Sequence, residues 1–253
     1  MKRMNSITFY ESNHQAHLRI TSMKKHQILL TVALLVTGFH VNPFLSAQVP
    51  APSAKPAMQF RTLGADCAPE GLNYQLGSNS VAVSVPQGMR SMPYDYSGAS
   101  PLVLFRTVTG KDGKPTQQPV VSVNLSQAGT YPLLVFFKGK TPDQPVVSVL
   151  KEDALSFPAG AFRLVNDSAV PLNAALPGGV LQVPPGSIKE YHGKEGGVFQ
   201  VGIKEIDPTG PFLAFNSNVG ILPGQRIMFL ILPPAAAAGH VQIKRYADGV
   251  PLP

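Results

Sequence analysis

Short apolar runs, separated by glycine and proline, recur along the chain from about Val81 onward. Regularly spaced runs that are rich in β-branched and aromatic residues are typical of β-sandwiches and β-barrels. The pattern predicts an all-β fold of one or two antiparallel β-sandwich units. The predicted strands are 81–85, 101–109, 119–125, 130–138, 145–151, 161–166, 172–176, 180–183, 187–191, 198–204, 211–216, 225–232 and 240–246.

Three of these runs indicate which faces of their strands are buried. Apolar residues alternate with polar residues or glycine at 199–204, which predicts a strand with one face in solvent. The residues at 131–137 and 226–232 are apolar at nearly every position. We therefore expect these two strands to be central in their sheets and covered on both faces.

The chain divides into a leader, a linker and a β-rich body. Residues 48–57 are rich in proline and alanine, which indicates a semi-extended tether. We assign 48–79 to this linker and an N-terminal segment, 80–158 to a first β-unit and 160–253 to a second β-sandwich unit. A single larger sandwich is the alternative.

Two short segments have echoes elsewhere in the chain. The sequence Gln-Pro-Val-Val-Ser-Val occurs at 118–123 and again at 144–149, and 160–168 is similar to 210–218. Such echoes arise either from duplication of a unit or from similar strand and turn chemistry at unrelated positions. The flanking spacings disagree, which favours the second explanation.

The N-terminal region has the pattern of an export signal. A basic start at 23–26 precedes an apolar run at 28–39, and a small residue, Ala47, follows. This run suits a signal peptide and is too short to span a membrane. We expect residues 1–47 to be a leader cleaved near Ala47, with Met23 as an alternative start. The mature protein is then periplasmic, in the outer envelope or extracellular, without a transmembrane span.

The net charge of the chain is +7, but the leader contributes much of it. Residues 1–47 contain five of the 21 basic residues and one of the 14 acidic residues, so the rest has a net charge near +3. A surplus this small, without clustering, argues against a nucleic-acid partner.

Candidate catalytic and metal-binding residues are few. Cys67 is the only cysteine, so no internal disulfide is possible, and its role is left open between an idle thiol and a bond to another chain. His192 and His240 are isolated, and a copper or zinc site needs three or four converging ligands. The acidic pairs Glu152/Asp153 and Glu205/Asp207 are interpreted as solvated strand ends. We expect no metal, no cofactor and no enzymatic activity.

The strongest candidate for a binding site is the loop at 90–98. Tyrosine, methionine and arginine are enriched in the cores of interfaces, and loops concentrate binding residues. The alternative is that the two tyrosines pack over the end of a sandwich. The candidate residues are Arg90, Met92, Tyr94, Asp95 and Tyr96.

Residues 162–168, Phe-Arg-Leu-Val-Asn-Asp-Ser, and the segment 181–187 with its Pro-Pro-Gly turn resemble a pattern of secreted bacterial immunoglobulin-like β-sandwich domains of unknown function. The resemblance covers about 160–246 and implies an immunoglobulin-like module of the cell envelope, with no catalytic residues to transfer. We expect an exported, non-catalytic interaction or structural module whose partner is another envelope or extracellular protein. A module that binds a glycan or small molecule through the Tyr94/Tyr96 loop is the alternative.

Overall fold

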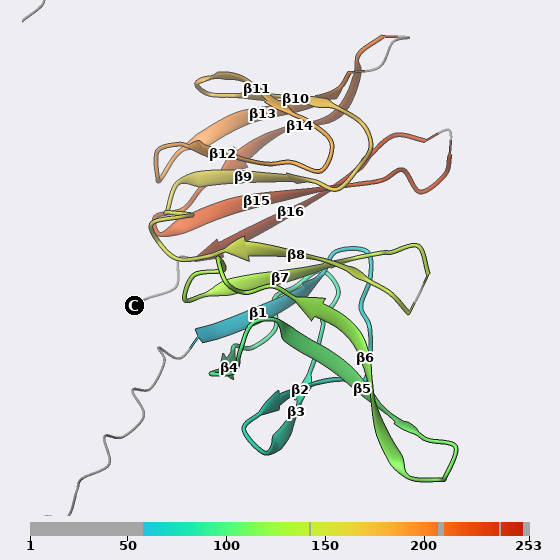
Figure 1. The fold of residues 1–253 in the computed structure, drawn as a ribbon. Helices are drawn as coiled ribbons and strands as arrows, with labels where there is room; N and C mark the ends of the chain where they lie inside the picture. Colours follow the sequence, from blue (N-terminus) through green and yellow to red (C-terminus); the bar gives the residue numbers. More distant parts are fainter. Residues whose placement is uncertain (1–57, 142, 207–209, 238, 250–253) are drawn as a thin grey trace, which may run out of the picture. The chain divides into compact units, whose positions relative to one another are not determined.

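The computed structural model describes residues 58–141, 143–206, 210–237 and 239–249. The predicted leader and its cleavage point near Ala47 lie outside these residues. All of the regular structure that is described is β-strand, as the spacing of the apolar runs predicted (Figure 1). The all-β class and the division into β-sandwich sheets are therefore confirmed.

The first half of the described chain contains eight strands. They are β1 (Met58–Gly64), β2 (Leu72–Leu76), β3 (Asn79–Val83), β4 (Tyr94–Tyr96), β5 (Leu102–Thr109), β6 (Pro115–Val123), β7 (Pro132–Phe137) and β8 (Val146–Lys151). Three of them, β1, β2 and β4, were not predicted. Strands β1 and β2 fall within 48–79, the range assigned to the linker and an N-terminal segment, so strands of the first half begin at Met58.

The second half contains eight more strands, and each overlaps a predicted run. They are β9 (Ala161–Asn166), β10 (Leu172–Leu176), β11 (Gly179–Val183), β12 (Ile188–His192), β13 (Val198–Glu205), β14 (Phe212–Gly220), β15 (Gln225–Leu232) and β16 (Gln242–Gly249).

The two halves have the same strand order. The first half forms the sheets β4-β1-β7-β8 and β3-β2-β5-β6, and the second forms β12-β9-β15-β16 and β11-β10-β13-β14. Adding eight to each strand number of the first half gives the second. The pairing directions agree as well, since β1 runs parallel to β7 and β9 runs parallel to β15, while the other pairs are antiparallel.

This repeat differs from the two sequence echoes. The segments at 118–123 and 144–149 lie on β6 and β8, which belong to different sheets of the same half. The segments at 160–168 and 210–218 lie on β9 and β14, again in different sheets. The echoes therefore reflect similar strand chemistry, as their spacing suggested, and the structural repeat has a period of eight strands.

Each half is a sandwich with its own apolar core. In the first, Phe60, Leu104 and Phe136 are fully buried between the two sheets. In the second, Phe162, Ile203 and Phe229 have the same role. The sheets that contain β1 and β9 are the inner layers, because the two sandwiches meet there (Figure 1).

A third apolar cluster, which we call the junction core, joins the two inner sheets. Its residues are fully or almost fully buried and come from both halves. They are Leu63, Ala65, Leu133, Val135, Phe137, Leu150, Phe157, Ala161, Val165, Met228, Leu230 and Leu232. Strands β7 and β15 therefore contact a sandwich core on one face and the junction core on the other, as their continuous apolar runs predicted.

Candidate functional site

The two tyrosines of the predicted binding loop belong to the core of the first sandwich. Tyr94 and Tyr96 are the ends of β4, which pairs with β1. The ring of Tyr94 lies 5.3 Å from that of Phe60, and the ring of Tyr96 lies 5.9 Å from that of Tyr74. Tyr96 is 8% exposed. The rings therefore pack over the end of the sandwich, which was the alternative interpretation of this loop.

The other three candidate residues point in different directions. Met92 is 79% exposed, and Asp95 is an exposed residue whose carboxylate accepts a hydrogen bond from Gln59 at 2.9 Å. Arg90 turns away from both and reaches the junction between the sandwiches. The structure thus does not bring the five predicted residues together in one site.

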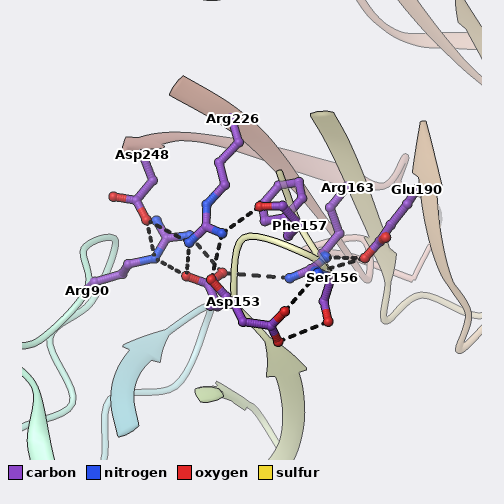
Figure 2. A network of polar contacts seen from close by, with 9 residues as sticks. Arg90, Asp153, Ser156, Phe157, Arg163, Glu190, Arg226 and Asp248 are labelled. Carbon is purple, nitrogen blue, oxygen red and sulfur yellow. Dashed lines mark hydrogen bonds and ion pairs between the residues drawn. The ribbon is translucent and has the colours of Figure 1, made fainter. Parts of the chain in front are cut away.

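Arg90 belongs instead to a network of charged side chains, which we call the junction cluster (Figure 2). Its members are three arginines and three carboxylates: Arg90, Arg163, Arg226, Glu152, Glu190 and Asp248. Arg90 and Glu152 come from the first sandwich, and the other four lie on strands of the second. The cluster adjoins the junction core and has no net charge when all six groups are ionised.

Glu152 lies at the centre of the cluster. It follows β8 directly, and its backbone N–H donates to the carbonyl oxygen of Tyr131 at 3.0 Å. Its carboxylate is 3.1 Å from a guanidinium nitrogen of Arg90, 2.9 Å from Arg226 and 3.7 Å from Arg163. One carboxylate thus binds arginines of both sandwiches.

Arg226 and Arg163 both lie close to one aromatic ring. The guanidinium carbons are 4.7 Å and 4.0 Å from the centre of the Phe157 ring, respectively. Arg226 also donates to the backbone oxygens of Glu152 and Phe157, each at 2.8 Å. Planar guanidinium groups stack well on aromatic faces and bind carboxylates through several N–H groups at once, which lysine does not reproduce.

A short turn holds Phe157 in this position. The Asp153 carboxylate accepts hydrogen bonds from the backbone N–H and the hydroxyl of Ser156, each at 2.9 Å. Burial alone raises the pKa of Asp153, but the hydrogen bonds from Ser156 more than offset this, and the pKa lies below its usual value. The lowered pKa favours the ionised carboxylate, which is the form that accepts both hydrogen bonds.

The electrostatics of the cluster favour a structural role. Desolvation lowers the pKa of Arg226, while the nearby carboxylates of Glu152 and Asp248 raise it again. Arginine does not lose its proton in proteins, so these guanidinium groups are poor proton-transfer groups. An ion pair between buried groups is costly to break, because the remaining charge has no partner.

The interpretation of Glu152 and Glu205 as solvated strand ends is wrong. Each is 5% exposed. The Glu205 carboxylate accepts a hydrogen bond from the backbone N–H of Val241 at 2.7 Å and lies 3.1 Å from Nδ1 of His240. For Glu152, the available signal was arginine within buried strands: Arg163 interrupts an apolar run and Arg226 begins one. A fully buried arginine requires a carboxylate partner.

The remaining candidate residues lie apart from one another. His192 ends β12, and the half-exposed His240 lies 3.3 Å, ring centre to ring centre, from Phe212. Cys67 is partly buried, and burial raises the pKa of its thiol, an effect that Asp66 strengthens. Within the described residues, no three histidine, cysteine, aspartate or glutamate side chains are grouped as a metal site would require.

Three of the hollows on the surface of the described residues bear on the choice of a site. Hollows of 630 Å³ and 470 Å³ lie on the outer sheets of the second and first halves, respectively. The third, which we call the β8–β12 groove, has a volume of 460 Å³ and lies between the edge strands of the two inner sheets. Arg163 and Glu190 of the junction cluster form part of its wall.

The comparisons with known proteins do not add a family. No family model matches the chain, and no curated protein matches it significantly. Across the ranges that the structure describes, no helix is long and apolar enough to cross a membrane.

Proposed function

We propose that the chain is an exported, non-catalytic module of the cell envelope or the extracellular space, built from two immunoglobulin-like sandwiches that act as one rigid body. Its role is structural or one of binding another protein of that compartment. The observation that carries this proposal is the junction cluster, in which Glu152 binds arginines from both sandwiches.

Buried charge at the junction favours a single rigid body over two domains that move independently. Two domains that move independently need no buried charge between them, because a polar, solvated interface is enough. Here three arginines with at most 9% side-chain exposure are matched with carboxylates across the junction. The junction core adds continuous apolar burial from both inner sheets. A body of this kind is suited to holding surfaces at a fixed separation, and the predicted signal peptide supports a position outside the cytoplasm.

The alternative, a glycan or small-molecule module that uses the Tyr94/Tyr96 loop, has less support. Sugar rings stack on exposed aromatic faces, but these two rings pack against Phe60 and Tyr74. The exposed residues of the loop are Met92, Pro93, Asp95, Ser97 and Gly98, and none of them is aromatic.

The test is to express the full chain in a bacterium, separate the cell compartments and sequence the N-terminus of the exported protein. The mature chain is expected in the periplasmic, outer-envelope or extracellular fraction, beginning near Gln48. A Leu35→Arg variant interrupts the apolar run of the leader and is expected to remain in the cytoplasm. If the unaltered chain keeps its leader and stays in the cytoplasm, the proposal is wrong.

The second arm tests the role in binding. Photo-reactive residues placed at exposed positions of both outer sheets, such as Val103 and Val198, are irradiated in intact cells of the native host. Discrete cross-links to an envelope or extracellular protein support an interaction module. Enzymatic turnover in a broad panel of hydrolase substrates contradicts the non-catalytic part of the proposal.

A further inference from the structure

We propose that the β8–β12 groove binds an extended, acidic segment of a partner protein, which pairs with β8 as an added strand of the sheet β4-β1-β7-β8. This inference deepens the proposed function, on which it rests, by naming the surface of the module and the chemistry of its partner.

The first argument is the free edge of β8. Strand β8 pairs with β7 and is the last strand of its sheet. Since the N–H of Glu152 donates to Tyr131 on the β7 side, the alternation of an antiparallel ladder directs the backbone groups of Val147, Val149 and Lys151 outward. An extended peptide that approaches this edge finds a row of unpaired donors and acceptors, which is the basis of strand addition.

The second argument is the shape of the groove beside this edge. Its wall contains Val149 and Leu150 of β8, Leu155 of the connecting turn, and Ile188, Glu190 and His192 of β12. The β12 residues alternate along the strand, and all three are exposed. Leu155 is 94% exposed and Ile188 is 45% exposed. A strand paired with β8 lies over this surface and covers these apolar side chains.

The third argument is a comparison with the opposite side of the junction. There, Arg90 from the segment before β4 crosses to Asp248 of β16, at 3.3 Å, and so joins the two inner sheets. On the β8 side the link is indirect: Glu152, directly after β8, lies 3.7 Å from Arg163 of β9, which binds Glu190 of β12. No hydrogen bond or ion pair between described residues joins β8 itself to β12. Strands β4 and β12 hold the same place in the repeat, as do β8 and β16. The strand β8 itself therefore has no direct polar partner on β12, and its edge is free to take an added strand.

The fourth argument is charge, which selects the partner. Arg163 already binds the Glu190 carboxylate, at 2.7 Å, so that this acid is compensated. The remaining charged wall residue is Lys151, which is exposed. A segment with carboxylates near Lys151 and β-branched residues near Ile188 complements the groove in both respects.

The probe is a fluorescent, end-capped peptide of alternating valine and glutamate of about six residues, the common length of a strand. Its binding to the mature chain is measured by fluorescence anisotropy. We expect saturable binding that weakens as salt is added. The same peptide with lysine in place of glutamate is expected to bind at least about tenfold more weakly, because it meets a like charge at Lys151.

Two matched pairs of variants locate the site. Val149→Pro removes an outward N–H and leaves the ladder with β7 in place, as proline is tolerated in edge strands whose N–H faces solvent. It is expected to abolish binding, whereas Val149→Thr keeps the N–H and retains it. Lys151→Glu is expected to weaken binding about tenfold. Lys204→Glu makes the same charge change at an exposed position of β13 and is expected to leave binding unchanged. Circular dichroism confirms that each variant is folded.

Other results overturn the inference. Peptide binding that survives both Val149→Pro and Lys151→Glu places the site elsewhere. Absence of peptide binding, or sedimentation that shows pairing of two chains through β8, shows that the edge does not serve an acidic partner segment. None of these results concerns export, so the proposed function can stand when the docking site fails, and the reverse is also true.

Discussion

Glu152 and Asp248 occupy the same position in the two sandwiches, and both bind Arg226. In the first sandwich, Phe60 pairs with a tyrosine, Leu63 pairs with Val135, and Val135 pairs with Ser148, four residues before Glu152. In the second sandwich, Phe162 pairs with a tyrosine, Val165 pairs with Leu230, and Leu230 pairs with Lys244, four residues before Asp248. The distances from these carboxylates to Arg226 are 2.9 Å and 3.5 Å.

The central carboxylate of the cluster is expected to be essential for stability. Glu152→Gln keeps the size of the side chain but leaves buried guanidinium charges without a counter-charge, which typically costs about 3–5 kcal/mol. Urea unfolding monitored by circular dichroism measures the loss. Glu70→Gln, at an exposed position, is the control and is expected to change stability by less than about 0.5 kcal/mol. Equal stability of the two variants contradicts a structural role for the cluster.

The tyrosines of β4 are expected to act as core residues. Tyr96→Ala removes a buried ring and is expected to lower stability by about 3 kcal/mol. Met92→Ala, four residues earlier and 79% exposed, should have almost no effect. Thermal unfolding distinguishes the two. A stable Tyr96→Ala variant that loses a partner restores the loop as a binding site.

Replacing the buried side-chain amide of Asn166 by a carboxylate is expected to lower the stability of the protein. The side-chain N–H groups of Asn166 lie within 2.9 to 3.1 Å of the backbone oxygens of Val170, Val183 and Pro184. Asn166→Asp replaces this donor with an acceptor, so a loss of about 3 kcal/mol or more is expected. Asn124→Asp, at an exposed asparagine in a similar Asn-x-Ser sequence, is the control. Chemical denaturation of both variants provides the comparison.

Asp167 is expected to make stability depend on pH. Burial, aided by the charge of Asp66, raises its pKa to about 6, above the unfolded value near 4. The folded state therefore binds this proton more tightly, and the stabilisation present below pH 4 is lost as the pH rises through 6. At pH 8, Asp167→Asn should be more stable than the unaltered protein by about 1 kcal/mol, after discounting for partial exposure. At pH 4 the two should agree.

The control for this pH dependence is Asp143→Asn, because that carboxylate is 85% exposed. Its stability relative to the unaltered protein should stay nearly constant across the same range. If the Asp167 variant behaves in the same way, Asp167 titrates as an ordinary surface acid.

The strands were largely predictable, because period-two alternation and continuous apolar runs report directly on burial. Runs such as 226–232 predicted a central strand covered on both faces, which β15 confirms. The missed strands had weaker patterns: β4 has three residues, and β1 contains Arg61 and Thr62 among its apolar residues. Short strands depend on pairing with their neighbours, which a local pattern does not contain.

The junction cluster was not predictable from local patterns. Arg90, Glu152 and Arg226 are separated by 62 and 74 positions, and only the packing of two sandwiches brings them together. Arg90 was singled out as a binding residue on its type alone, but its side chain is 9% exposed. Residue type showed that Arg90 makes a polar contact, and only the fold shows that the partner is within the chain.

The contiguous order of the repeat has a consequence for how the chain folds. The strands of the first sandwich all precede Glu152, so this half can form its sheets before the second half is synthesised. Its junction face, with Leu133, Val135 and Phe137, then remains exposed to water until β15 brings Met228 and Leu230 against it. An apolar surface that waits for one of the last strands is where chain-to-chain aggregation competes most strongly with folding.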